Sequence, residues 1–125
     1  MVRTVAMDTS ALMMPVESDV RVFDELDRVV GEYECVVPRA VVDELDKLSQ
    51  GGGAEATAAS VGADLATRCR PVDHEESYAD DAIVELGPEF DLVVTNDAPL
   101  RERLLDAGVP VIHIRGRNKL AITQP

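Results

Sequence analysis

The run of residues 92–95 constrains the fold more than any other part of the chain. Its sequence, Leu-Val-Val-Thr, shows no alternation of apolar and polar side chains, which is typical of a strand buried on both faces. Asp97 and Pro99 follow at once, and a helical pattern continues from there to Gly108. A doubly buried strand that leads directly into a helix predicts a parallel sheet covered by helices on both sides.

The same succession of apolar strand and amphipathic helix recurs along the chain. Strands are expected at residues 4–7, 33–37, 69–72, 92–95 and 109–114, with an edge strand at 120–122. Helices are expected from an N-cap at Ser18 to Gly31, at 39–48, at 54–68, from Asp80 or Asp81 to Leu86, and after Pro99; Asp8-Thr9-Ser10 suggests a turn. Right-handed crossovers then give α/β architecture, a three-layer α/β/α sandwich with a central, mostly parallel sheet, in one domain spanning residues 1–125.

The charge of the chain is strongly negative and unevenly spread. There are 24 acidic and 12 basic residues, giving a net charge of −12, and Lys47 and Lys119 are the lysines. Such a surface indicates a salt-rich, halophilic cytoplasm, because in molar salt the Debye length falls to about 3 Å. Residues 98–125 nevertheless carry an excess of positive charge, so a polyanion is expected to bind there. The basic side chains of that region include Arg101, Arg115, Arg117 and Lys119.

Composition also limits the class of protein and the kinds of binding site that the chain can form. No apolar run approaches the roughly 20 residues of a membrane span, so we expect a cytoplasmic protein with no membrane partner. Cys35 and Cys69 match no zinc-binding spacing, and in a reducing compartment we expect both as buried thiols. The scarcity of aromatic residues argues against a platform for stacking bases.

Three acidic positions fall at the ends of predicted elements, and a fourth lies within a helix. Asp8 and Asp97 follow the strands at residues 4–7 and 92–95, Asp80 or Asp81 opens a helix, and Glu44 lies on the helix after another strand. If the two strands are neighbours, Asp8 and Asp97 converge. Two carboxylates about 4 Å apart repel by roughly 4 kcal/mol at an effective dielectric constant near 20, so such a pocket needs protons or a divalent cation.

Each acid also has a simpler explanation. Asp97 and either member of the Asp80–Asp81 pair can cap a helix, and Glu44 can be a surface residue. One acid is enough for a cap, however, and the second of an adjacent pair repels the first. The paired carboxylates therefore favour a cation site.

The ligand chemistry favours magnesium or manganese. With no Cys or His among the acids, hard oxygen ligands suit Mg²⁺ or Mn²⁺ better than zinc. A cation held in this way can activate water for attack on a phosphodiester, which predicts metal-dependent phosphoryl hydrolysis. The expected ligands are Asp8, Asp97 and either Asp80 or Asp81, with Thr9, Ser10, Thr95 and Asn96 as donors around them.

Four motifs in order resemble the PIN-domain ribonuclease family and together cover nearly the whole chain. They are Asp8-Thr-Ser, PRAVVDEL at residues 38–45 with Glu44, ADDAIV at 79–84, and Thr95-Asn96-Asp97. The resemblance implies an α/β/α fold, Mg²⁺ or Mn²⁺ as cofactor, and endonucleolytic cleavage of single-stranded RNA. It implies catalytic acids at Asp8, Glu44, Asp97 and either Asp80 or Asp81. We favour Asp80 because Ile83, three positions on, matches the family's apolar spacing.

The motifs YADD at residues 78–81 and TND at 95–97, followed by a basic tail, resemble those of the ribosomal-RNA-processing branch of the family in archaea and eukaryotes. The alternatives are a toxin-type ribonuclease controlled by an antitoxin, and a non-catalytic RNA- or protein-binding scaffold. A haloacid-dehalogenase-like hydrolase would need an acid at Ser10, and a phospho-receiver module a lysine where Arg115 stands. The expected partners are RNA, a pre-ribosome or an antitoxin, and a second copy through apolar positions of residues 54–68.

Overall fold

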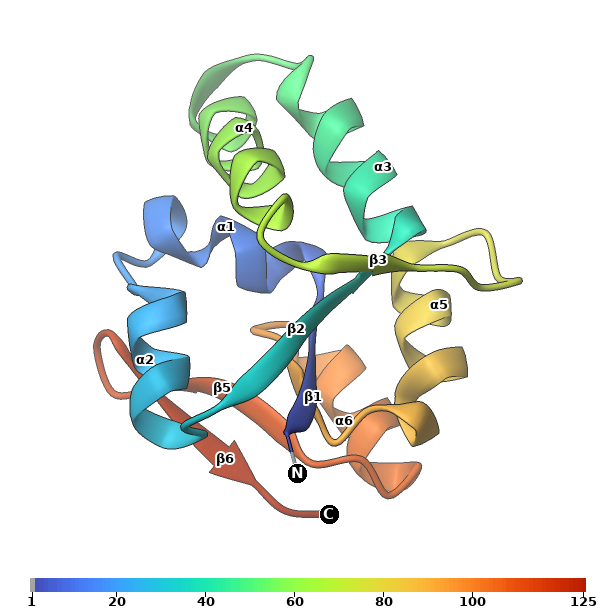
Figure 1. Ribbon diagram of the computed structural model, residues 1–125. Helices are drawn as coiled ribbons and strands as arrows, with labels where there is room; N and C mark the ends of the chain where they lie inside the picture. The colour runs from blue at the N-terminus through green and yellow to red at the C-terminus, as the bar shows by residue number, and fades with distance from the viewer. Residues whose placement is uncertain (1) are drawn as a thin grey trace.

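A six-stranded sheet lies at the centre of the protein, whose computed structural model describes residues 2–125 (Figure 1). The strands are β1 (Arg3–Met7), β2 (Tyr33–Pro38), β3 (Arg70–Val72), β4 (Leu92–Val94), β5 (Val111–Arg115) and β6 (Lys119–Thr123). They lie in the order β3-β2-β1-β4-β5-β6, with β1 to β5 parallel and β6 antiparallel to β5. The predicted mostly parallel sheet is confirmed, and β1 and β4 are neighbours in it.

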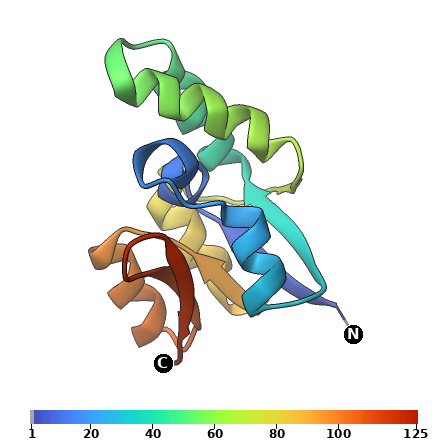
Figure 2. The ribbon, with the colours of Figure 1, turned by 90° about the vertical axis from the view of Figure 1, so that its left-hand side faces the viewer.

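Helices cover both faces of this sheet. They are α1 (Thr9–Glu17), α2 (Val22–Val29), α3 (Arg39–Ser49), α4 (Gly53–Ala66), α5 (Ala79–Leu86) and α6 (Ala98–Asp106), with a short 3₁₀ turn at Gly87–Glu89. Figures 1 and 2 show α5 and α6 on one side of the sheet and α2 on the other. The helices α3 and α4 form a hairpin beyond the end at which the parallel strands finish, here called the carboxyl edge. The α/β/α sandwich is thus confirmed.

The core is built from short aliphatic side chains. Val5 to Met7 of β1 and all three residues of β4 are buried, as expected for strands covered on both faces. Gly62 lets α4 approach α1 closely, since a Cβ there would lie 3.0 Å from the carbonyl oxygen of Leu12. Within residues 2–125, no helix combines the length and apolarity that crossing a bilayer requires.

The segment after β1 differs from the prediction. Residues 9–17 form helix α1, where we expected a turn, and Ser18 ends that helix and does not open the next. Asp8 caps α1, because its carboxylate accepts a hydrogen bond from the N–H of Ala11 at 2.7 Å. Pro15 lies inside the helix and masked the signal, since proline removes a hydrogen bond there. Burial of the apolar stretch Ala11–Met14 outweighs that loss.

The cysteines were also predicted wrongly: Cys35 and Cys69 form a disulfide, where we expected two reduced thiols. The register of the sheet explains the pairing. Val36 of β2 lies opposite Arg70 of β3, so the residues immediately before them face each other. This bond closes a loop with a sequence separation of 34 and joins β2 to the segment that follows α4.

An ion pair on α2 fixes the edge strand β6. Glu25 accepts hydrogen bonds from Arg28 at 2.7 Å and from the backbone N–H of Leu120 at 2.9 Å. Arg28 in turn donates to the carbonyl oxygen of Leu120 at 2.9 Å. The two side chains therefore satisfy both outward-facing backbone groups of Leu120, which would otherwise lie unpaired at the sheet edge.

We expect Glu25→Gln to destabilise the protein by about 2 kcal/mol at pH 7, because a charged hydrogen-bond acceptor is lost. The hydrogen bond from Arg28, followed by that from Leu120, lowers the pKa of Glu25 from 4.5 to about 2. A lowered pKa contributes stability above the unfolded value and loses it as the pH falls through the folded value. Chemical denaturation between pH 7 and pH 2 should therefore show the difference between wild type and variant shrinking below about pH 4; a difference independent of pH would contradict this role.

Candidate acidic site at the carboxyl edge of the sheet

Pairing of β1 with β4 brings two predicted acids to the same edge. Met7 lies opposite Val94, and the backbone N–H of Asp8 donates to the carbonyl oxygen of Val94 at 3.3 Å. Asp97 follows only three residues after Val94, at the start of α6. Because neighbouring parallel strands end together, the turns that carry Asp8 and Asp97 lie side by side.

Asp8 is held in a buried and well-ordered position. Its side chain is only 3% exposed and accepts hydrogen bonds from the hydroxyls of Ser10 and Thr95 and from the N–H of Ala11. Burial, with a smaller effect of the charge of Asp80, raises its pKa from 3.8 to about 7 against the opposing effect of these hydrogen bonds. A carboxylate in such a place favours binding a proton or a cation.

The donors around Asp8 join its turn to the turn after β4. The backbone N–H of Asn96 donates to Ser10 Oγ at 2.9 Å, and that of Asp97 donates to Thr95 Oγ1 at 3.0 Å. Thr9 behaves differently, because its buried hydroxyl has no partner within residues 2–125. Of the four predicted donors, Ser10 and Thr95 contact Asp8 through their side chains, and Asn96 contributes a backbone N–H.

Asp97 lies at the carboxyl edge and also caps the amino terminus of α6. Its Oδ1 accepts a hydrogen bond from the N–H of Leu100 at 3.0 Å. The capping explanation considered for the sequence therefore holds for Asp97. The cap also fixes the orientation of the carboxylate beside the turn that carries Asp8.

The two members of the acid pair point to different neighbours. Both lie in the first turn of α5, which starts at Ala79, earlier than predicted, and has no side-chain cap. Burial raises the pKa of Asp80, and the charges of Asp97 and Glu44 raise it further. Asp81 instead forms a salt bridge with Arg103, at 3.0 Å. The structure therefore places Asp80 among the edge carboxylates and Asp81 against α6.

Glu44 completes the group from α3. Its side chain is exposed, and its charge acts on Asp80. Across residues 2–125, no three carboxylate, thiol or imidazole groups lie close enough together to form a ready-made metal cage. The donor set nevertheless fits a hard cation, since Asp8, Asp80, Asp97 and Glu44 offer oxygen ligands alone and Asp80 is repelled by its acidic neighbours.

The predicted basic residues divide into two groups. Arg101 lies half-buried in the first turn of α6, whereas Arg115, Arg117 and Lys119 belong to the exposed β5–β6 hairpin. Arg115 and Lys119 share a hollow with Arg28 of α2. Sequence reasoning missed Arg28, because an arginine three residues after Glu25 on a helix suggests an ordinary surface ion pair.

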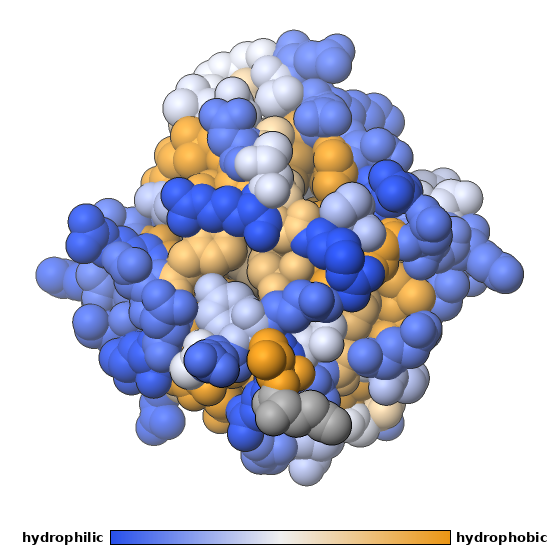
Figure 3. Space-filling view, viewed as in Figure 1, coloured by the Kyte–Doolittle hydropathy of each residue, from blue (hydrophilic) through white to orange (hydrophobic). Residues whose placement is uncertain are grey.

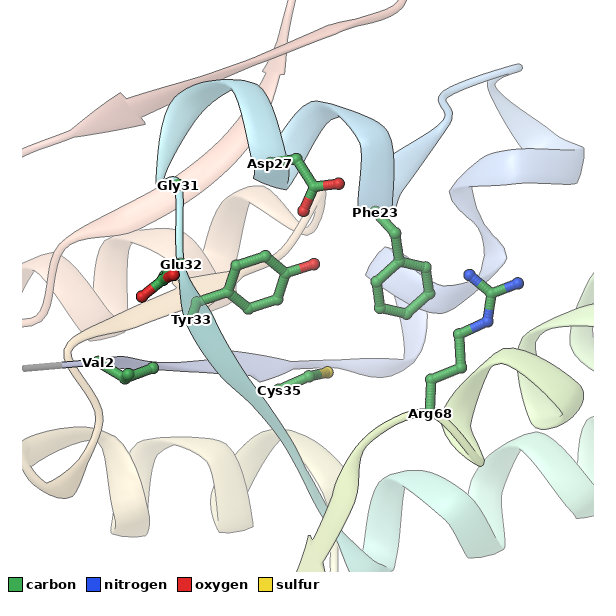
Figure 4. Close-up of a pocket in the computed structure, with 8 residues that line it drawn as sticks. All are labelled: Val2, Phe23, Asp27, Gly31, Glu32, Tyr33, Cys35 and Arg68. Carbon is green, nitrogen blue, oxygen red and sulfur yellow. The ribbon is translucent and has the colours of Figure 1, made fainter.

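Another hollow lies away from this edge, between α2 and the amino-terminal ends of β1 and β2. It measures about 530 Å³ and is lined by Phe23, Tyr33 and Cys35, with Arg68 above the Phe23 ring at 5.0 Å (Figure 4). Burial raises the pKa of Tyr33, and the charge of nearby Asp27 raises it further. Asp27 and Glu32 line it together with Arg68, whose charge offsets one of theirs, so the edge with four acids remains the better candidate for cation-dependent phosphodiester chemistry.

The fold and the site define an α/β/α domain that carries carboxylates from separate chain segments at the carboxyl edge of a parallel sheet, where their charges act on one another. A family model described as "PIN like domain" matches residues 5–117. The chain belongs to this PIN-like domain family, which confirms the family expected from the motifs.

Known relatives agree with this assignment. Ribonuclease VapC4 of Methanocaldococcus jannaschii is 26% identical over 121 residues, which covers 92% of each chain. The PIN domain endonuclease Utp24 superposes with a TM-score of 0.77 at 24% identity, over 98% of this chain and 92% of the other. A domain of a functionally unknown protein from Methanocaldococcus jannaschii gives a TM-score of 0.68 at 15% identity, over 94% and 95% of the two chains. The structural likenesses show the fold.

Proposed function

We propose that this protein is a divalent-metal-dependent endoribonuclease that cleaves single-stranded RNA. The observation that carries the proposal is the buried carboxylate of Asp8, which shares the carboxyl edge with Asp97 and feels the charge of Asp80. The family match and the likeness to a ribonuclease support it.

Asp8, Asp80 and Asp97 would hold Mg²⁺ or Mn²⁺. When bound, such a cation lowers the pKa of water and neutralises charge on a phosphodiester. The hydroxyls of Ser10 and Thr95 keep the Asp8 carboxylate oriented, as outer partners of a ligand do in metal sites. Glu44 is proposed to accept a proton at the open side of the site, where its side chain is exposed. Asp81 holds Arg103 and is not assigned a ligand role.

The first test is the dependence of cleavage on a cation. Labelled single-stranded RNA should be cut internally with Mn²⁺ or Mg²⁺ and not with excess EDTA, while a fully paired duplex of the same sequence stays intact. Adding Mn²⁺ should also raise the melting temperature, because the cation relieves repulsion among the acids and binds only the folded state. Cleavage that continues in EDTA would contradict the metal requirement. Specific RNA binding with no cleavage under any cation would favour the non-catalytic scaffold.

For the substrate, we propose precursors of ribosomal RNA. The support is the similarity of YADD at residues 78–81, TND at 95–97 and the basic tail to the ribosomal-RNA-processing branch. Purified protein should then cut a ribosomal precursor at few sites, and its expression alone should not arrest growth. Growth arrest relieved by a small co-expressed partner would instead indicate the toxin type.

A homodimer remains a prediction of the sequence. The small residues Ala58, Ala59, Gly62 and Ala66 of α4 are buried within the monomer, so a second copy would have to use the outer side of this helix. Figure 3 shows apolar surface near the α3–α4 hairpin amid largely hydrophilic flanks. Light scattering at high salt measures the oligomeric state directly, and a monomer would end this prediction.

A further inference from the structure

Three cations gather around one hollow in an otherwise acidic protein. The hollow measures about 400 Å³ and lies between α2 and the β5–β6 hairpin, with Arg28, Arg115 and Lys119 along its wall. The chain carries a net charge of −12, so most of its surface repels a polyanion. A cluster of cations on such a surface points to an anionic ligand.

Two of these cations come from the hairpin itself. Arg115 and Lys119 lie directly opposite each other in the antiparallel pairing of β5 and β6, and opposite residues in such a pair project from the same face. That face is the one against which α2 packs, since Lys119 lies 3.7 Å from Glu25. The hairpin therefore presents both cations toward α2.

Arg28 is the third cation, and its guanidinium is fixed. Nη2 donates to Glu25 at 2.7 Å and to the carbonyl oxygen of Leu120 at 2.9 Å, while Nε contacts Glu25 at 3.3 Å. Within residues 2–125, Nη1 has no hydrogen-bond partner and remains available to a ligand. A guanidinium held in one orientation loses little entropy when it binds an anion.

The charges do not cancel within the hollow. Glu25 is the carboxylate in contact with this group, and hydrogen bonds from Arg28 and from the backbone of Leu120 keep it ionised by lowering its pKa to about 2. One negative charge against three positive ones leaves an excess of two. In the adjoining hollow, which Asp19 also lines, Arg21 forms an ion pair with Asp24 at 3.9 Å.

The hollow lies at the same edge as the acids. Arg115 ends β5, which pairs with β4, and the turn after β4 carries Asp97. Neighbouring strands are about 4.8 Å apart, so the end of β5 that carries Arg115 lies one strand spacing from the end of β4 that leads to Asp97. The β5–β6 hairpin that carries Arg115 and Lys119 contacts α2 through Lys119 and Glu25, whereas Asp80 belongs to α5, which lies on the other side of the sheet (Figure 1).

We infer that Arg28, Arg115 and Lys119 form an anchor for the phosphate backbone of RNA, beside the acidic edge and separate from it. Guanidinium groups match phosphate oxygens in geometry as well as charge. The inference rests on the proposed ribonuclease function, which supplies the polyanion. It adds a binding subsite to that function, built by α2 together with the hairpin.

Binding of fluorescent single-stranded RNA in EDTA, followed by anisotropy over a range of salt concentrations, tests this anchor without cleavage. Each lost phosphate contact should lower the slope of log K against log salt by about 0.7 for a single strand. We expect Arg115→Ala to lower the slope by that amount and to weaken binding several-fold at low salt, and Lys119→Gln to do likewise. Arg3→Ala is the matched control: it removes one exposed charge from the opposite end of the sheet and should leave the slope unchanged.

The outcomes separate this inference from the proposed function. Slopes identical to wild type in both Arg115→Ala and Lys119→Gln would overturn the anchor, even with metal-dependent cleavage intact. Conversely, a reduced slope in a protein that never cleaves RNA would support the anchor and remove the nuclease. Polyglutamate serves as a competitor: if it displaces RNA as well as an unlabelled RNA of equal charge does, the preference for phosphate is wrong.

Discussion

Asp8→Asn is expected to reduce RNA cleavage about a thousandfold. The substitution removes the buried carboxylate proposed to hold the cation, while Asn keeps nearly the same shape among Ser10, Ala11 and Thr95. A thousandfold loss corresponds to about 4 kcal/mol of transition-state stabilisation, a magnitude reasonable for a lost metal ligand. Single-turnover cleavage of labelled RNA with Mn²⁺ measures it.

The same variant should be more stable than wild type at pH 8 without metal. The folded pKa of Asp8, about 7, lies above the unfolded value of 3.8. Between these values the folded state binds more protons, so the free energy of unfolding falls as the pH rises from about 4 to about 7 and is level above. Asn does not titrate and avoids this loss, which amounts to a few kcal/mol. The melting temperature of Asp8→Asn should therefore exceed that of wild type by more at pH 8 than at pH 4.

Asp81→Asn provides the matched control, because it removes a carboxylate adjacent to Asp80 in sequence but directed at Arg103. We expect cleavage within about threefold of wild type, since an exposed ion pair contributes little. Asp80→Asn should behave like Asp8→Asn. Equal losses of cleavage in Asp80→Asn and Asp81→Asn, or an Asp8→Asn protein as active as wild type, would contradict the assignment of the site.

Removing the disulfide should destabilise the protein by about 3–4 kcal/mol, the value expected for a closed loop of this size. The sequence separation of Cys35 and Cys69 is 34. For a domain of this length the loss lowers the melting temperature by roughly 10 °C. The double variant Cys35→Ser with Cys69→Ser, compared with wild type in differential scanning calorimetry, measures the effect.

Cleavage at room temperature should be nearly unchanged in this variant, because Cys35 lies within β2, ahead of the carboxyl edge where the acids gather. Adding a reductant to wild type should reproduce the loss of stability, whereas the same reductant should leave the double variant unaffected. Two titratable thiols in the oxidised, folded protein would contradict the bond.

The sequence by itself determined the architecture and the position of the acids. The unbroken apolar run before Asp97 predicted a doubly buried strand, and the succession of strands and helices predicted a parallel sheet. These features are local: periodicity, caps and breaks act over a few residues. The four motifs, taken in order, also identified the family.

Only the tertiary structure decided which distant residues meet. Pairing of β1 with β4 brought Asp8 to Asp97, pairing of β2 with β3 joined Cys35 to Cys69, and packing of α6 on α5 separated Asp80 from Asp81. Burial of its apolar side chains stabilises α1 despite Pro15. The hydrogen bond to the carbonyl oxygen of Leu120 directs Arg28 toward the β5–β6 hairpin. Strand order and the burial of particular side chains depend on the whole chain, whereas a pattern that repeats every two to four residues reports only on the element that contains it.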